Sequence, residues 1–320
     1  MECLFELTKL QSSRMKGIAI LLVLFAHIGL VKNGTGGVAL FLFSSGYGLF
    51  QSYAAKGMQG YFHKKIVSVY IPYAIVAAMQ LFIFRITNIK TIIITMVGLS
   101  FGKNVDPTYW YISYLFFWYL VFGISGIIND RIKKKHQIYV SNVVLAVIII
   151  LSIPLLQMVI GKGAWTSGSG ARFYVYMFPL GVLFGLAQRI YIMKRLKMVI
   201  WCMLFIVSVS YWLGNYGKVT SEIYTMFTIS QAFLCISLSQ LLDYHPFCKS
   251  LEFIGRYSYA IYLCEGFFLV KLYDWLDIIT SMELKHLAFL AVSVLSGYIL
   301  QNAVFSKLSL VVPNNTGLAM

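Results

Sequence analysis

A lysine and a histidine near the start of the chain have a spacing that suits a reaction site reaching into a membrane. Lys16 and His27 lie eleven residues apart along an otherwise apolar run. At about 100° and 1.5 Å per residue, this spacing puts both side chains on one helix face, about 16 Å apart. We therefore expect Lys16 at a membrane surface and His27 near the middle of an apolar layer about 30 Å thick.

His27 has the chemistry of a proton acceptor. An ionisable side chain inside an apolar segment is costly, so its presence indicates function by default. Histidine has an ordinary pKa of about 6.5, so its imidazole is available in the neutral form at working pH and can act as a general base. The other histidines of loops and span ends, among them His136, His245 and His286, are more simply solvated or interfacial residues.

The elements that carry Lys16 and His27 must be membrane-spanning helices. Hydrophobic residues make up 59% of the 320 residues and charged residues only 12%, and the mean hydropathy is +0.78. A soluble domain carries about twice that share of charged residues, so most of this chain lies in lipid. We predict an all-α, polytopic integral membrane protein that forms a single domain over residues 1–320.

Ten apolar segments are long enough to span the bilayer, and one more, at 91–101, is short enough to be re-entrant or interfacial. The N-terminus does not read as a cleavable signal peptide, because Glu2 and Glu6 dilute the n-region and no small-x-small site follows. The first segment should therefore stay as a helix. The predicted spans are 17–31, 38–55, 66–86, 109–128, 138–160, 173–187, 198–213, 223–242, 258–275 and 286–308.

The net charge of +15 reports topology. If the N-terminus is cytoplasmic, 17 of the 26 Lys and Arg residues lie on the inner side, and the positive-inside rule then puts both termini in the cytoplasm. The run Lys133-Lys134-Lys135 is a topology determinant that can also contact anionic lipid head groups, so no nucleic-acid partner is needed to explain it. The five cysteines show no CxxC pairing or metal-ligand spacing, and we expect reduced thiols and no metal site.

Further motifs follow His27 along the chain. Ser44, Ser45 and Gly46 in the second span are small residues that let helices approach closely and place hydroxyls inside the bundle; helix packing is the simpler interpretation. The run His63-Lys64-Lys65 stands at the cytoplasmic mouth of the third span, where its lysines either hold nucleotide phosphates as point charges or act as positive-inside anchors. Tyr70-Ile-Pro72-Tyr73 predicts a kinked, aromatic helix start.

In this order, the motifs resemble those of the integral-membrane acyltransferase 3 family over about residues 14–310. The hallmark of the family is an Arg or Lys, ten residues and then His in the first span, which matches Lys16 and His27. The other matching elements are Ser45-Gly46-Tyr47, the basic entry from Lys64-Lys65 to Pro72-Tyr73, Tyr109-Trp110-Tyr111-Ile112, Arg172 leading into Phe178-Pro-Leu-Gly181, and the run from Ile254-Gly255 to Tyr262-Leu263.

The resemblance implies transfer of an acyl group, usually acetyl, from cytoplasmic acyl-CoA to a hydroxyl of a cell-envelope carbohydrate. It places the protein as a multi-pass protein in a bacterial plasma (inner) membrane, with acyl-CoA as co-substrate and a carbohydrate acceptor and membrane lipid as partners. By the same resemblance, His27 is the general base. The acyl-CoA contacts are expected at Lys16, Lys64, Lys65 and Arg172, and the acceptor contacts at Ser45, Tyr47, Trp110 and Tyr111.

Two positions depart from the family pattern. The family tends to carry two arginines three residues apart at the entry to the third span, where this chain has Lys65 and Ser68. After Tyr-Leu in the ninth span the family often has His, whereas Cys264-Glu265 follows here. Glu265 is therefore a candidate catalytic residue that orients or pairs with His27 or Arg172, or else a protonated or snorkelling carboxylate within a span.

Two simpler alternatives stay open. For any one of Tyr47, Trp110 and Tyr111, aromatic packing at a membrane interface is the simpler interpretation. A secondary transporter or flippase would use His27, Arg172 and Glu265 as a proton or substrate path, although the hydropathy shows no pair of matching interrupted helices in two halves. Release of free CoA in the presence of an acceptor would distinguish the enzyme. The acceptor's identity and the oligomeric state are left open.

Overall fold

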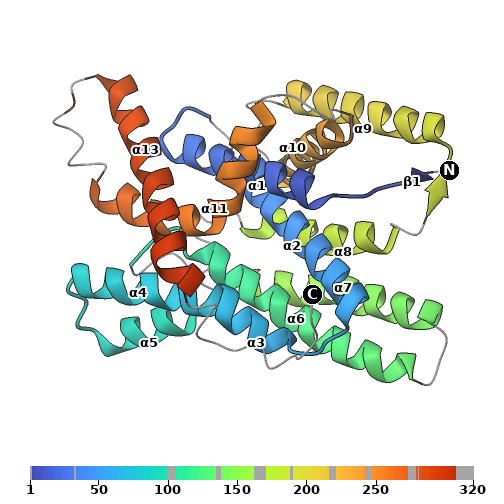
Figure 1. Ribbon diagram of the computed structural model, residues 1–320, viewed down its shortest axis with the longest axis horizontal. Coiled ribbons are helices and arrows are strands. Elements are labelled where there is room, and N and C mark those ends of the chain that lie inside the picture. The colour runs from blue at the N-terminus through green and yellow to red at the C-terminus, as the bar shows by residue number, and fades with distance from the viewer. Residues whose placement is uncertain are drawn as a thin grey trace. The chain divides into compact units, whose positions relative to one another are not determined.

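The computed structural model is built almost entirely of helices (Figure 1). It describes residues 2–31, 34–99, 105–134, 138–161, 171–187, 190–215, 221–241, 247–272, 279 and 281–307. The chain forms two compact units, each made of two stretches of sequence. Unit 1 comprises Met1–Gly57 and Ser125–Arg256, and unit 2 comprises Met58–Ile124 and Tyr257–Met320.

Unit 1 is organised around α2 (Thr35–Lys56), which contacts α1 (Lys9–His27), α8 (Met177–Ala187) and α10 (Ser221–Leu241). α10 in turn packs against α9 (Lys194–Asn215). The other elements of the unit are α7 (Ile138–Gly161), the 3₁₀ turn η2 (Ala171–Tyr174), β1 (Glu2–Cys3), β2 (Tyr191–Ile192), and parts of α6 (Trp110–Lys133) and α11 (Phe247–Phe267), both of which continue into unit 2.

The N-terminal segment of unit 1 is tied to the helices that follow it. β1 pairs antiparallel with β2, with Glu2 opposite Ile192 and Cys3 opposite Tyr191. Phe5 is fully buried and makes edge-on ring contacts with Phe43 and Phe184. These two strands have two residues each and leave the all-α class unchanged.

The first helix begins and ends earlier than predicted. Thr8 caps it, because its hydroxyl accepts a hydrogen bond from the Gln11 N–H (3.2 Å) while the Gln11 side chain accepts one from the Thr8 N–H (3.0 Å). The helix stops at His27, and Gly29 follows in the left-handed region with φ 77°. α1 therefore covers Lys9–His27 instead of 17–31, and His27 is its last residue.

Unit 2 contains one long helix made of α3 (Tyr61–Lys65), the π turn η1 (Ile66–Tyr70) and α4 (Ile71–Ile83). Pro72 has no N–H to donate to the carbonyl four residues earlier, and the turn before it widens so that the Ile71 N–H donates to the Ile66 carbonyl. The proline thus lies inside the helix instead of near its start. The remaining elements are α5 (Ile89–Val97), η3 (Phe268–Leu272), α13 (Met282–Leu300) and η5 (Gln301–Phe305).

The helices confirm the class of an α-helical membrane protein. Four helical segments in the described part of the chain are long and apolar enough to cross a membrane: Tyr61–Ile83, Trp110–Lys133, Lys194–Asn215 and Met282–Phe305. α8 has only 11 residues, which at about 1.5 Å each cover about half of an apolar layer. α5, with 9 residues, is too short to cross, as expected. The count of ten spans, the cytoplasmic termini and the single domain stay predictions.

Candidate active site

Lys16 and His27 lie on one continuous helix. α1 runs unbroken from Lys9 to His27, so Lys16 and His27 share a helix face as predicted from their spacing. Lys16 is half-buried, whereas His27 is exposed. The imidazole therefore stands at an accessible helix end, where a reactant can reach it.

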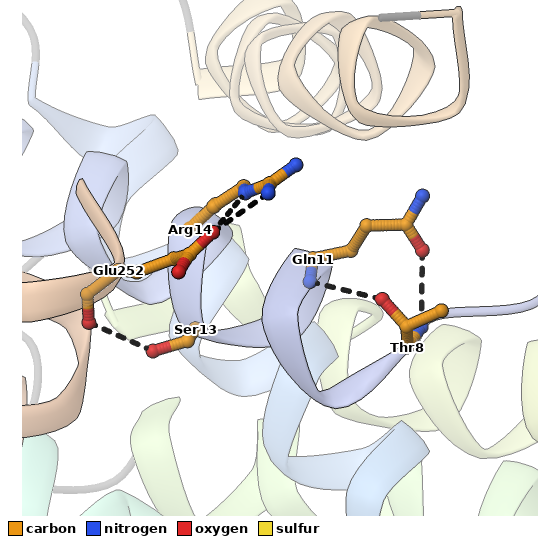
Figure 2. A network of polar contacts seen from close by, with 5 residues as sticks. All are labelled: Thr8, Gln11, Ser13, Arg14 and Glu252. Carbon is orange, nitrogen blue, oxygen red and sulfur yellow. Dashed lines mark hydrogen bonds and ion pairs between the residues drawn. The ribbon is translucent and has the colours of Figure 1, made fainter. Parts of the chain in front are cut away.

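The part of α1 before Lys16 is bound to the start of α11 by a polar network (Figure 2). The Arg14 guanidinium forms an ion pair with the Glu252 carboxylate at 2.6 Å, and its Nε donates to the same oxygen at 2.7 Å. The Ser13 hydroxyl donates to the Glu252 carbonyl at 3.0 Å. Both charged side chains are mostly buried, at 15% and 13% exposed, so the pair is shielded from solvent. This network fixes the helix that carries Lys16.

Two glycines bring the same helices into backbone contact. A Cβ atom on Gly17 would lie 2.2 Å from the Leu251 carbonyl oxygen, and one on Gly255 would lie 1.8 Å from the Ser13 carbonyl oxygen. Neither helix could approach so closely with a larger residue at these positions. Gly255 belongs to the Ile254-Gly255 element of the family resemblance, and its role here is to seat α11 against α1.

The second-span motif and the Phe178–Gly181 motif also meet in this way. A Cβ atom on Gly46 would lie 2.2 Å from the Phe178 carbonyl oxygen, and one on Gly181 would lie 2.1 Å from the Phe43 carbonyl oxygen. α2 and α8 therefore touch backbone to backbone. The simpler interpretation of Gly46, helix packing, is confirmed. Ser45 is half-buried beside this contact.

Tyr47 serves the attachment of the N-terminal segment. Its hydroxyl accepts a hydrogen bond from the Leu7 N–H at 3.1 Å, and its ring meets Phe5 edge-on with the centroids 5.3 Å apart. The Trp201 indole N–H donates to the Leu4 carbonyl at 3.1 Å nearby in the chain. These contacts account for Tyr47 as a packing residue, and its contact with an acceptor stays a prediction.

In unit 2, the aromatic motif at the start of α6 packs on α11. Trp110 is half-buried and Tyr111 is buried, with the Tyr111 ring edge-on to Tyr262 at a centroid distance of 5.1 Å. The Tyr262 hydroxyl donates to the Thr108 carbonyl. Of the two predicted acceptor contacts here, Trp110 is the more exposed residue.

Glu265 is fully buried, and the residue after it in α11, Gly266, lies against a second buried carboxylate, Asp106, which was not predicted as a site residue. Asp106 accepts hydrogen bonds from the Gln80 amide (2.9 Å), the Thr108 N–H (2.8 Å) and the Thr108 hydroxyl (2.6 Å). A Cβ atom on Gly266 would lie 2.2 Å from the Asp106 carboxylate. A readable signal was present: Asp106 directly precedes a proline and an apolar helix, the position of a helix cap.

The predicted donor contacts occupy different surroundings. Lys64 is exposed, and its carbonyl accepts a hydrogen bond from the Ser68 hydroxyl at 2.6 Å, so Ser68 is used within its own helix. The Lys65 ammonium lies 4.6 Å from the centroid of the Tyr119 ring, a cation–π contact. Arg172 belongs to η2, and its side chain is outside the described part of the structure.

Comparison with known proteins agrees with the order of the motifs. A family model described as an acyltransferase domain, that of the acyltransferase 3 family, matches residues 13–301. No curated protein and no solved structure gives a match to this chain. The family match begins within α1, before Lys16, and extends just past the end of α13. Because it covers most of the 320 residues, the chain belongs to the acyltransferase 3 family of membrane acyltransferases.

Proposed function

We propose that this protein is a membrane O-acyltransferase that moves an acyl group, in the first instance acetyl, from cytoplasmic acyl-CoA to a hydroxyl of a cell-envelope carbohydrate. The observation that carries the proposal is the accessible His27 at the end of a helix that also holds Lys16, in a chain that belongs to an acyltransferase family. The expected location is the plasma (inner) membrane of a bacterium, where donor and acceptor both reach one membrane protein.

In this proposal His27 is the general base. A carbohydrate hydroxyl is a poor nucleophile, whereas a thioester is an activated acyl donor, so the enzyme mainly needs a base beside the hydroxyl. The neutral imidazole takes the hydroxyl proton as the oxygen attacks the thioester carbonyl carbon. The tetrahedral intermediate then collapses, the carbon–sulfur bond breaks, and the imidazolium returns the proton to the departing sulfur. The products are the ester and free CoA.

We assign donor binding to three cations of the family motifs. Lys16 stands on the face of α1 that leads to His27, and Lys64 is exposed at the start of the third predicted span. Lysine side chains hold phosphates as point charges, which suits the phosphates of CoA. Arg172 is kept as a third donor contact on the strength of the family motif that follows it.

We assign acceptor binding to the aromatic start of α6 and to the second-span motif. The half-buried Trp110 offers a ring face for a sugar, with Tyr111 packed behind it. Ser45 and Tyr47 are kept as further acceptor contacts. Because Glu265 has no exposed surface, we give it a positioning role within α11 and no contact with substrate.

The test is transfer by the full chain reconstituted in liposomes with acetyl-CoA and an envelope carbohydrate fraction. We expect free CoA to appear only when both substrates are present, and the carbohydrate to gain the mass of one or more acetyl groups. A chain carrying His27→Ala should release no CoA above the protein-free control. Movement of carbohydrate across the liposome membrane without acetylation would instead support the transporter.

A further inference from the structure

A groove in unit 2 runs along the helix that begins at Tyr61. It has a volume of ≈ 190 Å³ and is lined by α3, η1 and the middle of α6. Most of its lining side chains are aromatic, two are aliphatic, and the one charged group among them is the Lys65 ammonium. A hydrophobic trough with a cation on its wall suits an amphiphile with an anionic head.

The groove opens through apolar side chains that the protein leaves uncovered. Phe62, Ile66 and Leu120 are 42%, 49% and 54% exposed. They belong to two helices that are long and apolar enough to cross a membrane, Tyr61–Ile83 and Trp110–Lys133. Large exposed apolar residues on such helices face lipid chains, so the groove is reached from the bilayer.

Two of the tyrosines that line the groove donate hydrogen bonds to backbone carbonyls. The Tyr61 hydroxyl donates to the Tyr119 carbonyl at 2.9 Å, and the Tyr70 hydroxyl donates to the Met96 carbonyl at 3.1 Å. Both phenol groups are thus engaged with backbone, and their rings present apolar surface. The π turn η1 contributes Ile66 and Tyr70 to the lining, and π turns are frequent at functional sites.

Positive charge gathers at the end of the groove nearer the start of the helix. The Lys65 ammonium lies against the Tyr119 ring, and the exposed Lys64 precedes it in the chain. No acidic residue is among the groove's lining side chains. Lysines at a helix end keep their stems along apolar surface and their charge at the head-group level, and basic pockets between membrane helices bind anionic lipid head groups.

We propose that this groove is a binding site for an anionic phospholipid, with one acyl chain in the trough and the phosphate at Lys65. A phospholipid is favoured over acyl-CoA because the opening faces lipid and because the polar groups of the lining are few: the Lys65 ammonium and tyrosine hydroxyls, two of which already donate to backbone carbonyls. The site assigns Lys65 to lipid and leaves Lys16 and Lys64 to the donor. It goes beyond the transfer reaction, and its readout is lipid binding.

The test is native mass spectrometry of the full chain in detergent, titrated with phosphatidylglycerol or with phosphatidylcholine of the same chains. We expect wild-type protein to bind one phosphatidylglycerol in preference to phosphatidylcholine. Lys65→Gln should weaken the binding of phosphatidylglycerol about fivefold, because each basic residue near a membrane surface contributes about 1 kcal/mol to binding of anionic lipid. Leu120→Trp, which fills the trough, should weaken the binding of both lipids and abolish the preference for phosphatidylglycerol.

Matched controls are Lys90→Gln, an exposed lysine of α5, and Leu295→Trp, a residue of α13 that is 57% exposed. Both should bind phosphatidylglycerol as the wild type does. The proposal is overturned if Lys65→Gln and Leu120→Trp are indistinguishable from these controls. It is equally overturned if CoA displaces phosphatidylglycerol and Lys65→Gln weakens CoA instead, because the groove would then be a donor site.

Discussion

The glycine motifs of unit 1 and the buried carboxylate of unit 2 hold helices together by different means, although unit 2 also has such a glycine, Gly297 of α13, against the Ile261 backbone of α11. Unit 1 brings α1 against α11 and α2 against α8 by backbone contacts at four glycines: Gly17, Gly255, Gly46 and Gly181. Unit 2 surrounds Asp106 with Gln80 and Thr108 and packs tyrosine rings around them. Close contact between small residues suits helices in lipid, where the hydrophobic effect does not drive helices together, and buried polar groups must satisfy one another.

The contrast distinguishes motif residues that pack helices from motif residues that are candidates for substrate contact. The glycines of three motifs in unit 1 are explained by packing, so their presence does not mark substrate contacts. Lys16 and His27 do not make these close helix contacts, and His27 is exposed. In unit 2, by contrast, Asp106 and Glu265 are buried carboxyl groups, which close packing of small residues does not explain.

The largest effect is expected where the backbone contact of unit 1 is broken. Gly46→Leu would push a side chain into the Phe178 carbonyl, so α2 and α8 must separate at a cost of about 3 kcal/mol or more. We expect little folded protein after purification, measured by size-exclusion chromatography. Gly48→Leu is the control on the same helix, because a Cβ atom there meets nothing within 4 Å. Equal yields of the two variants would contradict the role of Gly46 in packing α2 against α8.

The next effect tests the polar centre of unit 2. Asp106→Ala leaves the Gln80 amide and both Thr108 donors without their acceptor, and unsatisfied buried groups cost about 1–3 kcal/mol each. A clearly lower melting temperature in detergent should result. Asp106→Asn should be much milder, because its oxygen still serves Thr108 and the Gln80 amide can turn its oxygen toward the new NH₂ group. If Asn is as damaging as Ala, the negative charge itself is required.

A smaller effect would show that unit 1 also relies on a hydrogen bond. Tyr47→Phe removes the acceptor of the Leu7 N–H but keeps the ring contact with Phe5, so the expected loss is about 1–2 kcal/mol. A modest drop in melting temperature with unchanged transfer would make Tyr47 a packing residue. If transfer is lost while the melting temperature is unchanged, Tyr47 contacts the acceptor.

The smallest effect concerns Lys16, which shares α1 with Gly17 and His27. Lys16→Ala should raise the KM for acyl-CoA about fivefold, in keeping with about 1 kcal/mol per cation facing an anionic partner. Lys16→Arg should stay close to wild type, because the role is electrostatic. An unchanged KM in the alanine variant would leave Lys64 and Arg172 as the donor contacts.

Much of the helical order was readable from the sequence. The apolar segments at 38–55 and 138–160 coincide closely with α2 and α7, because long apolar runs without charges have few other options. Even the early start of α1 left a trace, since Thr8 and Gln11 have the spacing of a capping box. The missing N–H of Pro72 explains why the helix contains a π turn. It does not explain why that turn covers Ile66–Tyr70.

The site was less predictable because its contacts join distant residues. Nothing within the second span reveals that Gly46 meets Phe178, 132 residues later, or that Gly17 meets Leu251. Hydropathy is the same for an apolar residue that faces lipid and for one that faces protein. It therefore could not predict that Asp106 lies in a buried cluster. The spacing of Lys16 and His27 was predictable because both lie on one helix.

The central claim is tested most directly by the rate of acyl transfer in a His27→Ala variant at saturating acyl-CoA. Because His27 is exposed at the end of α1, the variant should fold with wild-type yield and melting temperature. General-base loss then predicts a fall in kcat of about 10²- to 10⁴-fold, with His286→Ala on α13 as an unaffected control. A His27→Ala protein that transfers acetyl at a near-normal rate would contradict the account.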